Sequence, residues 1–391
     1  MRFLHLLLVG AALGCSSTST NEGDADAGTG GSAGDSGADA PALCDDAGLA
    51  SDPNHCGACG HSCLGGGCVD GKCMPTSIFD NDTKKYGSSG TMGPLLVDGD
   101  YLFVGDAGDL GATGLTGALW RMATDGTDLL RLDEPGSTEV QAIALNKSSL
   151  FWTSLEGSVK QVSTAGGSVS LLAPETGGTL RGIAAAGNHV FYAAGPVIKQ
   201  LYTIGNASAA VTPGLANPQG VAVSGSHVYF TTLGAGSSDG AVQRAPVDLS
   251  NTPPALKGPV EPLVAAQPGP GALALDATHV FWLTGDGSVH RAGLGGDEPT
   301  VLAEGKEDPD RTPQGIALDA TYVYWTSWGA CTNAAGCGAK PLQGRVQRVP
   351  KAGGAKRILA EGKFLPTGIG VDASAVYWTN WWFGSVSRLA L

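Results

Sequence analysis

The residues with the clearest capacity for chemistry are nine cysteines, which fall into three groups. Cys15 ends an apolar N-terminal run, and Cys331 and Cys337 stand together late in the chain. The other six form a dense cluster: Cys44, Cys56, Cys59, Cys63, Cys68 and Cys73. An even cluster in a segment too short for a hydrophobic core predicts disulfides in an exported protein. Fifteen pairings of six cysteines are possible, and the sequence does not choose among them.

Zinc binding is the competing interpretation of this cluster. Cys56 and Cys59 have the two-residue spacing of zinc ligands, and His55 and His61 stand nearby. The even number of cysteines and an oxidising compartment favour disulfides instead. We therefore predict no metal and no cofactor. Cys331 and Cys337 are predicted to form a further disulfide that stiffens a long loop, rather than to remain free thiols.

The N-terminal segment predicts export. A charged start is followed by an apolar run, Phe3 to Leu13, that is too short to span a bilayer, so residues 1–14 are predicted to be a signal peptide. Ala12-Leu13-Gly14-Cys15 resembles the lipobox of bacterial lipoproteins, in which the cysteine is acylated and becomes the new N-terminus. This resemblance implies lipidation of Cys15 at the outer membrane or cell surface. Ordinary secretory cleavage is the alternative.

Residues 15–43 are rich in Ser, Gly, Ala and Asp and contain no Lys or Arg. Such a composition cannot bury enough apolar surface to offset the entropy of ordering, so a disordered tether is expected. The net charge of −13, without a basic block, argues against nucleic acid as a partner. The membrane would be contacted only through the lipid anchor. We expect a monomer.

The cysteine cluster lies in a predicted module at residues 44–75. Its core runs Asp52-Pro53-Asn54-His55-Cys56-Gly57-Ala58-Cys59-Gly60-His61-Ser62-Cys63. This stretch resembles the Cys-rich core of stigma-specific Stig1-like proteins, a module that is similar to those in large, Gly-rich exported proteins of myxobacteria. The resemblance carries no plant-type function here.

Residues 76–391 are dominated by an internal repeat of seven units, each with a short apolar strand, a turn and a second strand that carries an aromatic pair. The first column of the pair is Phe103, Phe151, Phe191, Tyr229, Phe281, Tyr324 and Tyr377. The second column is Val104, Trp152, Tyr192, Phe230, Trp282, Trp325 and Trp378. Neighbouring residues of a strand face opposite sides, so each pair supplies packing to both faces of a sheet.

The third strand of each unit opens with a Gly-x-Val or Gly-x-Leu motif, and a fourth apolar run follows in most units. Four antiparallel strands repeated around an axis predict an all-β fold, a seven-bladed β-propeller. The last unit ends after three strands, and residues 76–80 are expected to supply its fourth and close the ring. Tyr324-Trp325-Thr326 and Tyr377-Trp378-Thr379 resemble the YWTD repeats of low-density-lipoprotein-receptor propellers, which implies the same kind of blade.

Recurrence also separates structural from functional residues. His189, His227 and His279 share one position, which indicates a structural role, and His290 is the singular histidine of the repeats. Five arginines share a third-strand position and are predicted to pack along the blades with their charge at the edge. They are Arg121, Arg244, Arg291, Arg348 and Arg388.

The residues just before the first strands, and the loops between second and third strands, are expected to meet on one face. This face is expected to form the mouth of the propeller's central channel. The candidate ligand-binding residues there are Gln141, Arg181, Gln219, Gln314, Trp328, Trp381 and Trp382. Amide and guanidinium donors beside aromatic rings suit a glycan or an extended peptide. The alternative is that the tryptophans only fill gaps between blades.

The sequence thus favours a binding or scaffolding propeller of the cell envelope, with a glycan, peptide or protein ligand. The rival is a propeller enzyme, similar to seven-bladed streptogramin-cleaving lyases or six-bladed lactone hydrolases. Their histidine, glutamate and metal-ligand sets have no residue-by-residue match in this chain, so no catalytic residue is predicted.

Overall fold

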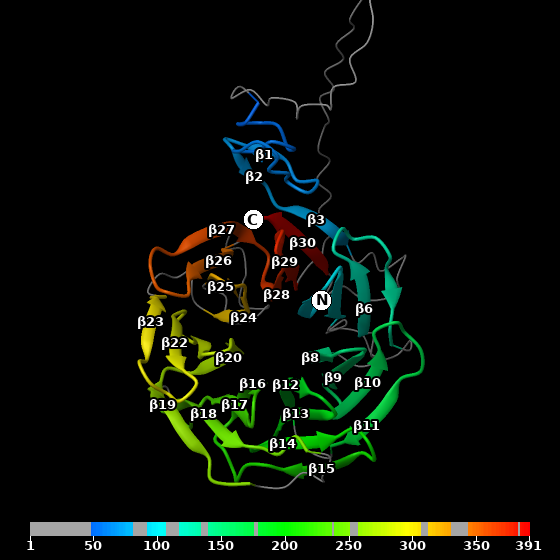
Figure 1. Ribbon diagram of the computed structural model, residues 1–391, viewed down its shortest axis with the longest axis vertical. Coiled ribbons are helices and arrows are strands. Elements are labelled where there is room, and N and C mark those ends of the chain that lie inside the picture. The colour runs from blue at the N-terminus through cyan, green and yellow to red at the C-terminus, as the bar shows by residue number, and fades with distance from the viewer. Residues whose placement is uncertain are drawn as a thin grey trace, which may run out of the picture. The chain divides into compact units, whose positions relative to one another are not determined.

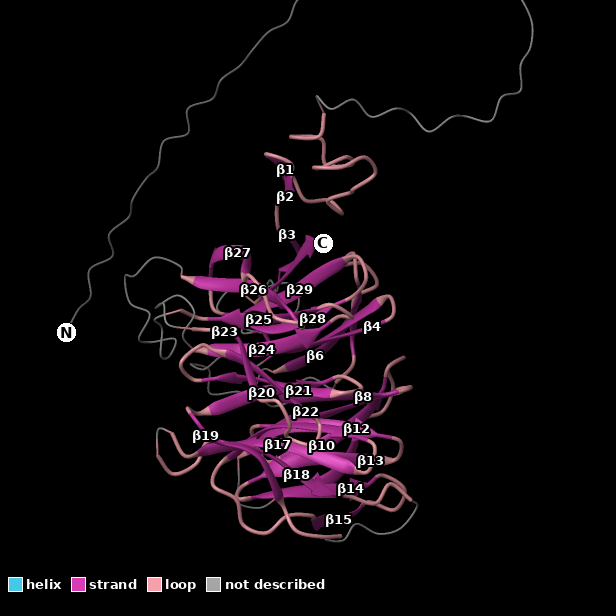
Figure 2. Ribbon diagram, turned by 60° about the vertical axis from the view of Figure 1, so that its left-hand side comes forward, coloured by secondary structure: helices cyan, strands magenta, loops and turns pink. Residues whose placement is uncertain are grey.

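The computed structural model describes residues 48–80, 92–106, 117–133, 140–175, 179–236, 238–250, 257–305, 312–329, 343–381 and 384–391. The chain divides into two compact units, 1–43 and 44–391, and every described residue belongs to the second. The predicted signal peptide and tether therefore lie outside the described residues, together with Cys15, Cys44, Cys331, Cys337 and Trp382. The described segments contain strands and turns but no helix (Figure 2), and so none that could cross a membrane.

Seven four-stranded antiparallel sheets form a ring around a central channel (Figure 1), which confirms the predicted seven-bladed propeller. In the first six blades, the strands follow chain order from the channel outward. The first three blades are β4 (Met92–Asp98), β5 (Tyr101–Asp106), β6 (Ala118–Ala123) and β7 (Leu130–Arg131); β8 (Val140–Asn146), β9 (Ser149–Ser154), β10 (Ser158–Ser163) and β11 (Ser170–Pro174); and β12 (Leu180–Ala186), β13 (His189–Ala194), β14 (Val197–Tyr202) and β15 (Ala207–Ala210).

The next three blades repeat this arrangement. They are β16 (Pro218–Ser224), β17 (His227–Thr232), β18 (Gly240–Pro246) and β19 (Glu261–Gln267); β20 (Pro270–Leu275), β21 (His279–Thr284), β22 (Val289–Gly293) and β23 (Thr300–Ala303); and β24 (Pro313–Leu318), β25 (Tyr322–Ser327), β26 (Gly344–Pro350) and β27 (Arg357–Lys363). The outer strands stand at the perimeter of the ring in Figure 1, and the first strands surround the channel.

The seventh blade joins the two ends of the propeller. Its inner strands are β28 (Pro366–Val371), β29 (Ala375–Asn380) and β30 (Ser385–Ala390), and its outer strand is β3 (Thr76–Asp80). β3 pairs antiparallel with β30, from Thr76 opposite Arg388 to Asp80 opposite Ser385. This pairing covers the edge that β30 would otherwise expose.

The aromatic pairs form the core between blades. The first aromatic of one blade packs with the second aromatic of the next: Phe151 shares a buried cluster with Tyr192, and Tyr324 shares one with Trp378. Both faces of each blade are therefore filled from a single two-residue motif, as the alternation of side chains along a strand requires. Trp378 has no exposed surface.

The threonine that follows several aromatic pairs connects neighbouring blades. Its Oγ1 donates a hydrogen bond to a carbonyl at the start of the next blade's inner strand: Thr153 to Arg181 (3.1 Å), Thr231 to Gly271 (2.6 Å), Thr326 to Thr367 (2.7 Å) and Thr379 to Gly93 (2.7 Å). In the last three of these blades, the same hydroxyl accepts a bond from the backbone N–H of a glycine in its own inner strand. The Tyr-Trp-Thr motif thus combines core packing with a link between blades.

These glycines lie where adjacent inner strands approach closely. A Cβ added at Gly368 would lie 2.5 Å from the carbonyl oxygen of Gly93 and 2.6 Å from the amide nitrogen of Leu95. Both are backbone atoms, which cannot rotate away as a side chain can. The glycine is therefore required by the distance between the seventh and first blades.

We predict that Gly368→Ala destabilises the protein by about 1–3 kcal/mol, because the added methyl group overpacks the junction between the blades. Gly271→Ala is the matched control, since a Cβ at Gly271 meets nothing within 4 Å. Chemical denaturation of the two variants and the wild type measures the difference. Equal stabilities for the two variants would show that the junction relaxes without cost.

The repeated third-strand arginines also connect blades, and this confirms their structural role. Four of the five guanidinium groups donate to a turn carbonyl of the following blade: Arg121 to Thr164 (3.2 Å), Arg244 to Leu294 (2.8 Å), Arg291 to Lys351 (2.7 Å) and Arg388 to Thr124 (2.9 Å). The fifth, Arg348, lies over the ring of Tyr322 in its own blade, 4.4 Å from the centroid. In the other four, the charge thus reaches beyond the edge of its own blade, which the sequence did not indicate. The bond from Arg388 links the last blade to the first.

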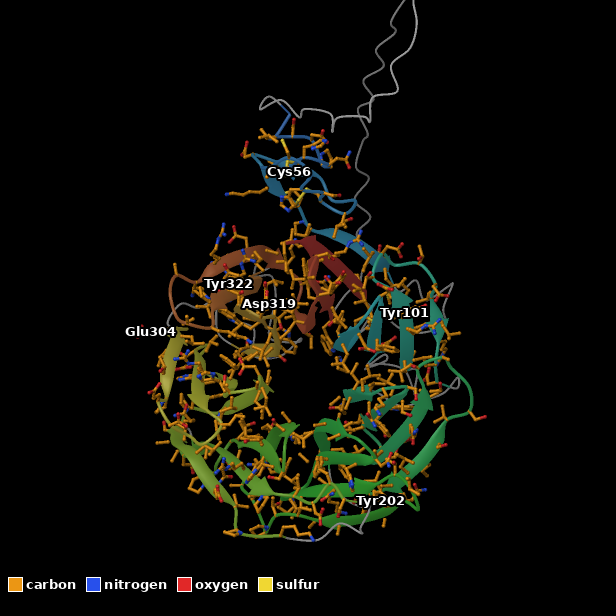
Figure 3. The ribbon with its side chains drawn as sticks, in the orientation of Figure 1. Cys56, Tyr101, Tyr202, Glu304, Asp319 and Tyr322 are labelled. Carbon is orange, nitrogen blue, oxygen red and sulfur yellow. A yellow bond between two sulfur atoms is a disulfide. The ribbon has the colours of Figure 1, made fainter. Side chains whose placement is uncertain are left out.

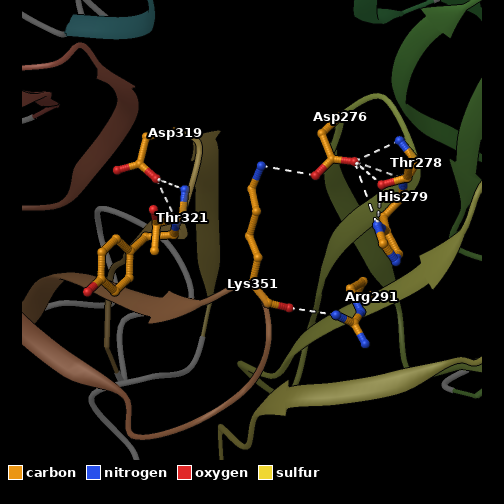
Figure 4. A network of polar contacts seen from close by, with 8 residues as sticks. Asp276, Thr278, His279, Arg291, Asp319, Thr321 and Lys351 are labelled. Atoms are coloured by element: carbon orange, nitrogen blue, oxygen red, sulfur yellow. Dashed lines mark hydrogen bonds and ion pairs between the residues drawn. The ribbon is translucent and has the colours of Figure 1, made fainter.

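A further contact joins the fifth and sixth blades (Figure 4). Asp319 accepts a hydrogen bond from the Tyr324 hydroxyl within its own blade (2.7 Å). The fifth blade has Phe281 in place of this tyrosine, and there Lys351 of the sixth blade donates to Asp276 (3.0 Å) instead. Although burial raises the pKa of Asp276, the bonds from the Thr278 backbone and from Lys351 outweigh it and lower the pKa to about 2.

The Cys-rich module contains β1 (Cys68–Val69) and β2 (Lys72–Cys73), and its sulfur–sulfur bonds are visible near Cys56 in Figure 3. Disulfides join Cys56 to Cys68 and Cys63 to Cys73, and Cys59 is also disulfide-bonded. The sulfurs of Cys56, Cys63 and Cys73 lie within 4.8 Å of one another. Because they are oxidised to disulfides, they are not thiolate ligands, and the zinc interpretation is wrong for them.

Candidate functional site

A cavity of about 660 Å³ opens at the centre of the ring, and the first strands of all seven blades line it. In Figure 3 the side chains stop short of the axis, which leaves the centre of the ring open. The volume lies within the range of small-molecule binding sites. Each blade thus lines the same cavity with described residues of its inner strand.

The side chains at the mouth are placed by an irregularity common to every blade. The pairing register between the first and second strands shifts near the start of the first strand, for example between Val140 and Ala142 and between Pro218 and Val221. A bulge of this kind can turn a side chain away from the sheet. The residues at this position are Gly93, Gln141, Arg181, Gln219, Gly271, Gln314 and Thr367, and all of them line the cavity.

Arg181 is held by its neighbour in the next blade. Its Nη1 donates a hydrogen bond to Oε1 of Gln219 over 3.1 Å. The Nε2 of Gln219 donates to the backbone carbonyls of Asn217 and Pro218, both at 3.1 Å. Because the amide nitrogen is used in this way, the amide oxygen faces Arg181. The guanidinium is exposed at the mouth in a defined position.

Trp328 and Trp381 form an aromatic pair on the other side of the mouth. Their ring centroids are 5.9 Å apart, with 34° between the ring planes. Nε1 of Trp328 donates to Oγ1 of Thr367 over 3.3 Å, and that hydroxyl donates to the carbonyl of Leu365 over 3.0 Å. Both tryptophans are half-buried, so part of their surface remains accessible from the cavity.

An apolar ring lies next to this polar rim, and sequence reasoning did not assign it to the channel. Its members are Leu95, Ile143, Ile183, Val221, Leu273, Ile316 and Ile369. They occupy one column of the repeat, two residues after the bulge position. Their recurrence was visible in the sequence, but it could not show that this column reaches the channel. The cavity therefore combines branched aliphatic walls with polar groups at its rim.

The structure brings together six of the seven residues that the sequence placed at the mouth. Gln141, Arg181, Gln219, Gln314, Trp328 and Trp381 line the cavity, and Trp382 lies outside the described residues. The Nε2 of Gln314 donates to the carbonyl of Thr312 over 3.1 Å. Among the described lining residues, Arg181 carries the only charged side chain. A ligand-binding role for these residues stays a prediction.

His290 does not belong to this site. Its ring stacks on Trp282 at a centroid distance of 5.3 Å, and its Nε2 lies 3.1 Å from Oγ1 of Thr284. Burial lowers the pKa of His290 below its ordinary value, although Asp286 opposes the shift. The imidazole therefore packs as a largely neutral ring within the fifth blade. It is absent from the described cavity lining.

No protein-family model matches the chain, and no curated protein matches it. Solved propellers resemble it at low sequence identity. A catalytically inactive virginiamycin B lyase from Staphylococcus aureus with quinupristin has a TM-score of 0.59 and 13% identity, covering 81% of this chain and 99% of the lyase. YCF48 bound to D1 peptide has a TM-score of 0.53 and 11% identity, covering 81% and 95%.

The computationally designed Ika8 protein has a TM-score of 0.51 and 16% identity, covering 77% of this chain and 83% of its own. At such identities the likeness shows the fold alone. The protein is thus a seven-bladed β-propeller with a disulfide-bonded, Cys-rich N-terminal module. Its propeller neighbours include an enzyme and a peptide-bound protein.

Proposed function

We propose that this protein is an exported, lipid-anchored binding protein of the bacterial cell envelope, which holds a glycan, peptide or protein ligand at the mouth of its channel. One observation carries the proposal: a cavity of about 660 Å³ gathers a guanidinium, three glutamine amides and a tryptophan pair from five different blades. Ligand sites typically have aromatic and aliphatic walls and a small number of polar groups in defined positions.

The proposed location rests on two features of the chain. Disulfides in the Cys-rich module fit an oxidising compartment outside the cytoplasm. The apolar N-terminal run with its lipobox-like end supports export and acylation at Cys15. A lipid anchor followed by a long polar tether would leave the propeller free to meet ligands away from the membrane surface.

The rival function is a propeller enzyme, and the likeness to virginiamycin B lyase is the observation in its favour. General acid–base chemistry needs a group that exchanges protons near neutral pH, such as histidine or a carboxylate with a shifted pKa. In the described lining, the only ionisable side chain is the guanidinium of Arg181, which stays protonated. This composition supports binding more directly than catalysis.

The test is a binding screen of the full-length, detergent-solubilised protein against glycan and peptide panels, with metal analysis of the same sample. Trp381→Ala should weaken binding by about tenfold or more, because an aromatic platform is lost, while the thermal melt stays close to wild type. Ile204→Ala is the control, since Ile204 is exposed in a turn away from the cavity. Tightly bound divalent metal with turnover of a bound compound would favour the enzyme, and unchanged affinity in the tryptophan variant would refute the proposed site.

A further inference from the structure

We infer that the ligand is an acidic saccharide, whose carboxylate binds Arg181 while a sugar ring lies against the tryptophan pair, Trp328 and Trp381. This inference rests on the proposed function and specifies its ligand. It follows from the charge of the mouth, from the fixed position of the guanidinium and from the place of the two groups in the ring.

The charge at the mouth is unusual for this protein. The chain has a net charge of −13, yet the one charged group among the described lining residues is a cation. Within the described part of the chain, the hydrogen-bond partner of the Arg181 side chain is the neutral amide of Gln219, not a carboxylate. The positive charge is therefore not neutralised by those neighbours and remains available to an anion.

The guanidinium is also held in place before any ligand arrives. Gln219 directs its oxygen to Nη1 of Arg181 because its nitrogen is bonded to two backbone carbonyls. This contact occupies one edge of the guanidinium, which has five donors in a planar fork. The remaining donors can bind the two oxygens of a carboxylate, and fixing the side chain in advance lowers the entropic cost of that contact.

Arg181 and the tryptophan pair face each other across the channel. Arg181 belongs to β12 of the third blade, whereas Trp328 and Trp381 follow the second strands of the sixth and seventh blades. In a ring of seven blades, the sixth and seventh are the two that lie opposite the third. A ligand that used both groups would carry its anionic group at one end and a flat or ring-shaped apolar face at the other.

The backbone at the mouth favours a saccharide over an extended peptide. Peptides are commonly bound by adding a strand, which needs free backbone N–H and C=O groups. Here the carbonyls of Gly93, Arg181, Gly271 and Thr367 accept bonds from threonine hydroxyls of the preceding blades. The amides of Gly220, Gly315 and Gly368 donate to the same hydroxyls. At these positions the backbone groups are already used within the propeller, which leaves the side chains for recognition, and amides with tryptophan rings suit sugar hydroxyls and sugar faces.

Calorimetric titration of the full-length protein tests the inference with trisaccharides of galacturonate, glucuronate and mannuronate, each beside its methyl ester. The ester keeps the sugar and removes the negative charge. At least one acid should bind roughly ten- to hundredfold more tightly than its ester, the range for losing a charged hydrogen bond. Arg181→Gln should lower the affinity for the acid to about that for the ester, and it should weaken ester binding far less, because the ester has lost the negative charge. Arg357→Gln, an exposed arginine on the outer strand β27, is the control and should change neither.

Each other outcome is decisive. Esters or neutral glycans that bind as tightly as the acids would overturn the inference while leaving the proposed function intact. Tight binding of peptides with a free C-terminal carboxylate, without binding of any acidic saccharide, would also overturn the inference and leave the proposed function intact. A preference for the acid that persists in the Arg181→Gln protein would refute the role of this residue. If neither glycans nor peptides bind, the inference fails, and the glycan and peptide ligands of the proposed function fail with it.

Discussion

Replacing the closing strand, Thr76–Asp80, with five glycine and serine residues is expected to abolish cooperative folding of the propeller. The replacement removes the fourth strand of the seventh blade and exposes β30 as an unpaired edge. It also removes Phe79, which is 7% exposed and lies 6.1 Å from the Trp120 ring between centroids. Burial of that ring alone contributes about 1.5–3 kcal/mol. The total loss of several kcal/mol is large against a typical folding stability of about 5–15 kcal/mol.

Near-ultraviolet circular dichroism and size-exclusion chromatography would measure this effect, because loss of closure predicts loss of tertiary signal and association through the free edge. The control makes the same exchange at residues 24–28, in the predicted tether, where no change in folding is expected. A monomeric protein that keeps its cooperative unfolding transition after the β3 exchange would show that three strands suffice for the seventh blade.

The Cys-rich module meets the propeller at this closure. Arg388 of β30 donates to the carbonyl of Thr124 in the first blade and to the carbonyl of Leu64 in the module. Leu64 packs against the buried cluster that contains Phe79 and Tyr377. One arginine thus connects the last blade, the first blade and the module. This arrangement gives the module a structural contact with the junction of the two ends of the ring.

The blades could be predicted from the sequence because their packing is local and repeated. Phe151 and Trp152 are adjacent in the chain, so alternation along a strand already assigns them to opposite faces. The closing strand was predictable for a similar reason: the last repeat lacks one strand, and the segment Thr76–Asp80 precedes the first repeat. The disulfide pairing was not predictable, because many pairings satisfy the same spacing and only folding selects one.

The candidate site was predictable in position but not in geometry. A column of differing residues at Gln141, Arg181 and Gln219 indicated the mouth, and the cavity contains all three. The bond from Arg181 to Gln219 joins two blades, and its direction depends on which atom of the amide is used by the backbone. Such a choice follows from three-dimensional contacts rather than from residue spacing. The hydrogen bonds of the threonine hydroxyls also join neighbouring blades, so residue spacing could not predict them either.

Trp378→Ala is expected to destabilise the protein by about 3–5 kcal/mol, the usual cost of removing a large ring from a packed core. Trp378 is fully buried, it packs with Tyr324 of the sixth blade, and its Nε1 donates to Oδ1 of Asn380 over 3.2 Å. Truncation would leave a cavity between two blades and remove the hydrogen-bond donor of a buried amide oxygen. The cavity and the lost hydrogen bond both lower the free energy of unfolding.

Trp328→Ala is the matched comparison. Trp328 comes two residues after the Tyr-Trp-Thr motif of the sixth blade, but it lies at the rim of the channel instead of in the core. Its ring is half-buried and its Nε1 bonds a threonine hydroxyl, so its loss should cost roughly 1 kcal/mol in stability. Urea denaturation, followed by circular dichroism, would separate the two variants by their midpoints. Similar losses from both would mean that Trp328 fills a gap between blades, and a small loss in Trp328→Ala together with reduced ligand affinity would identify its ring as part of the binding surface.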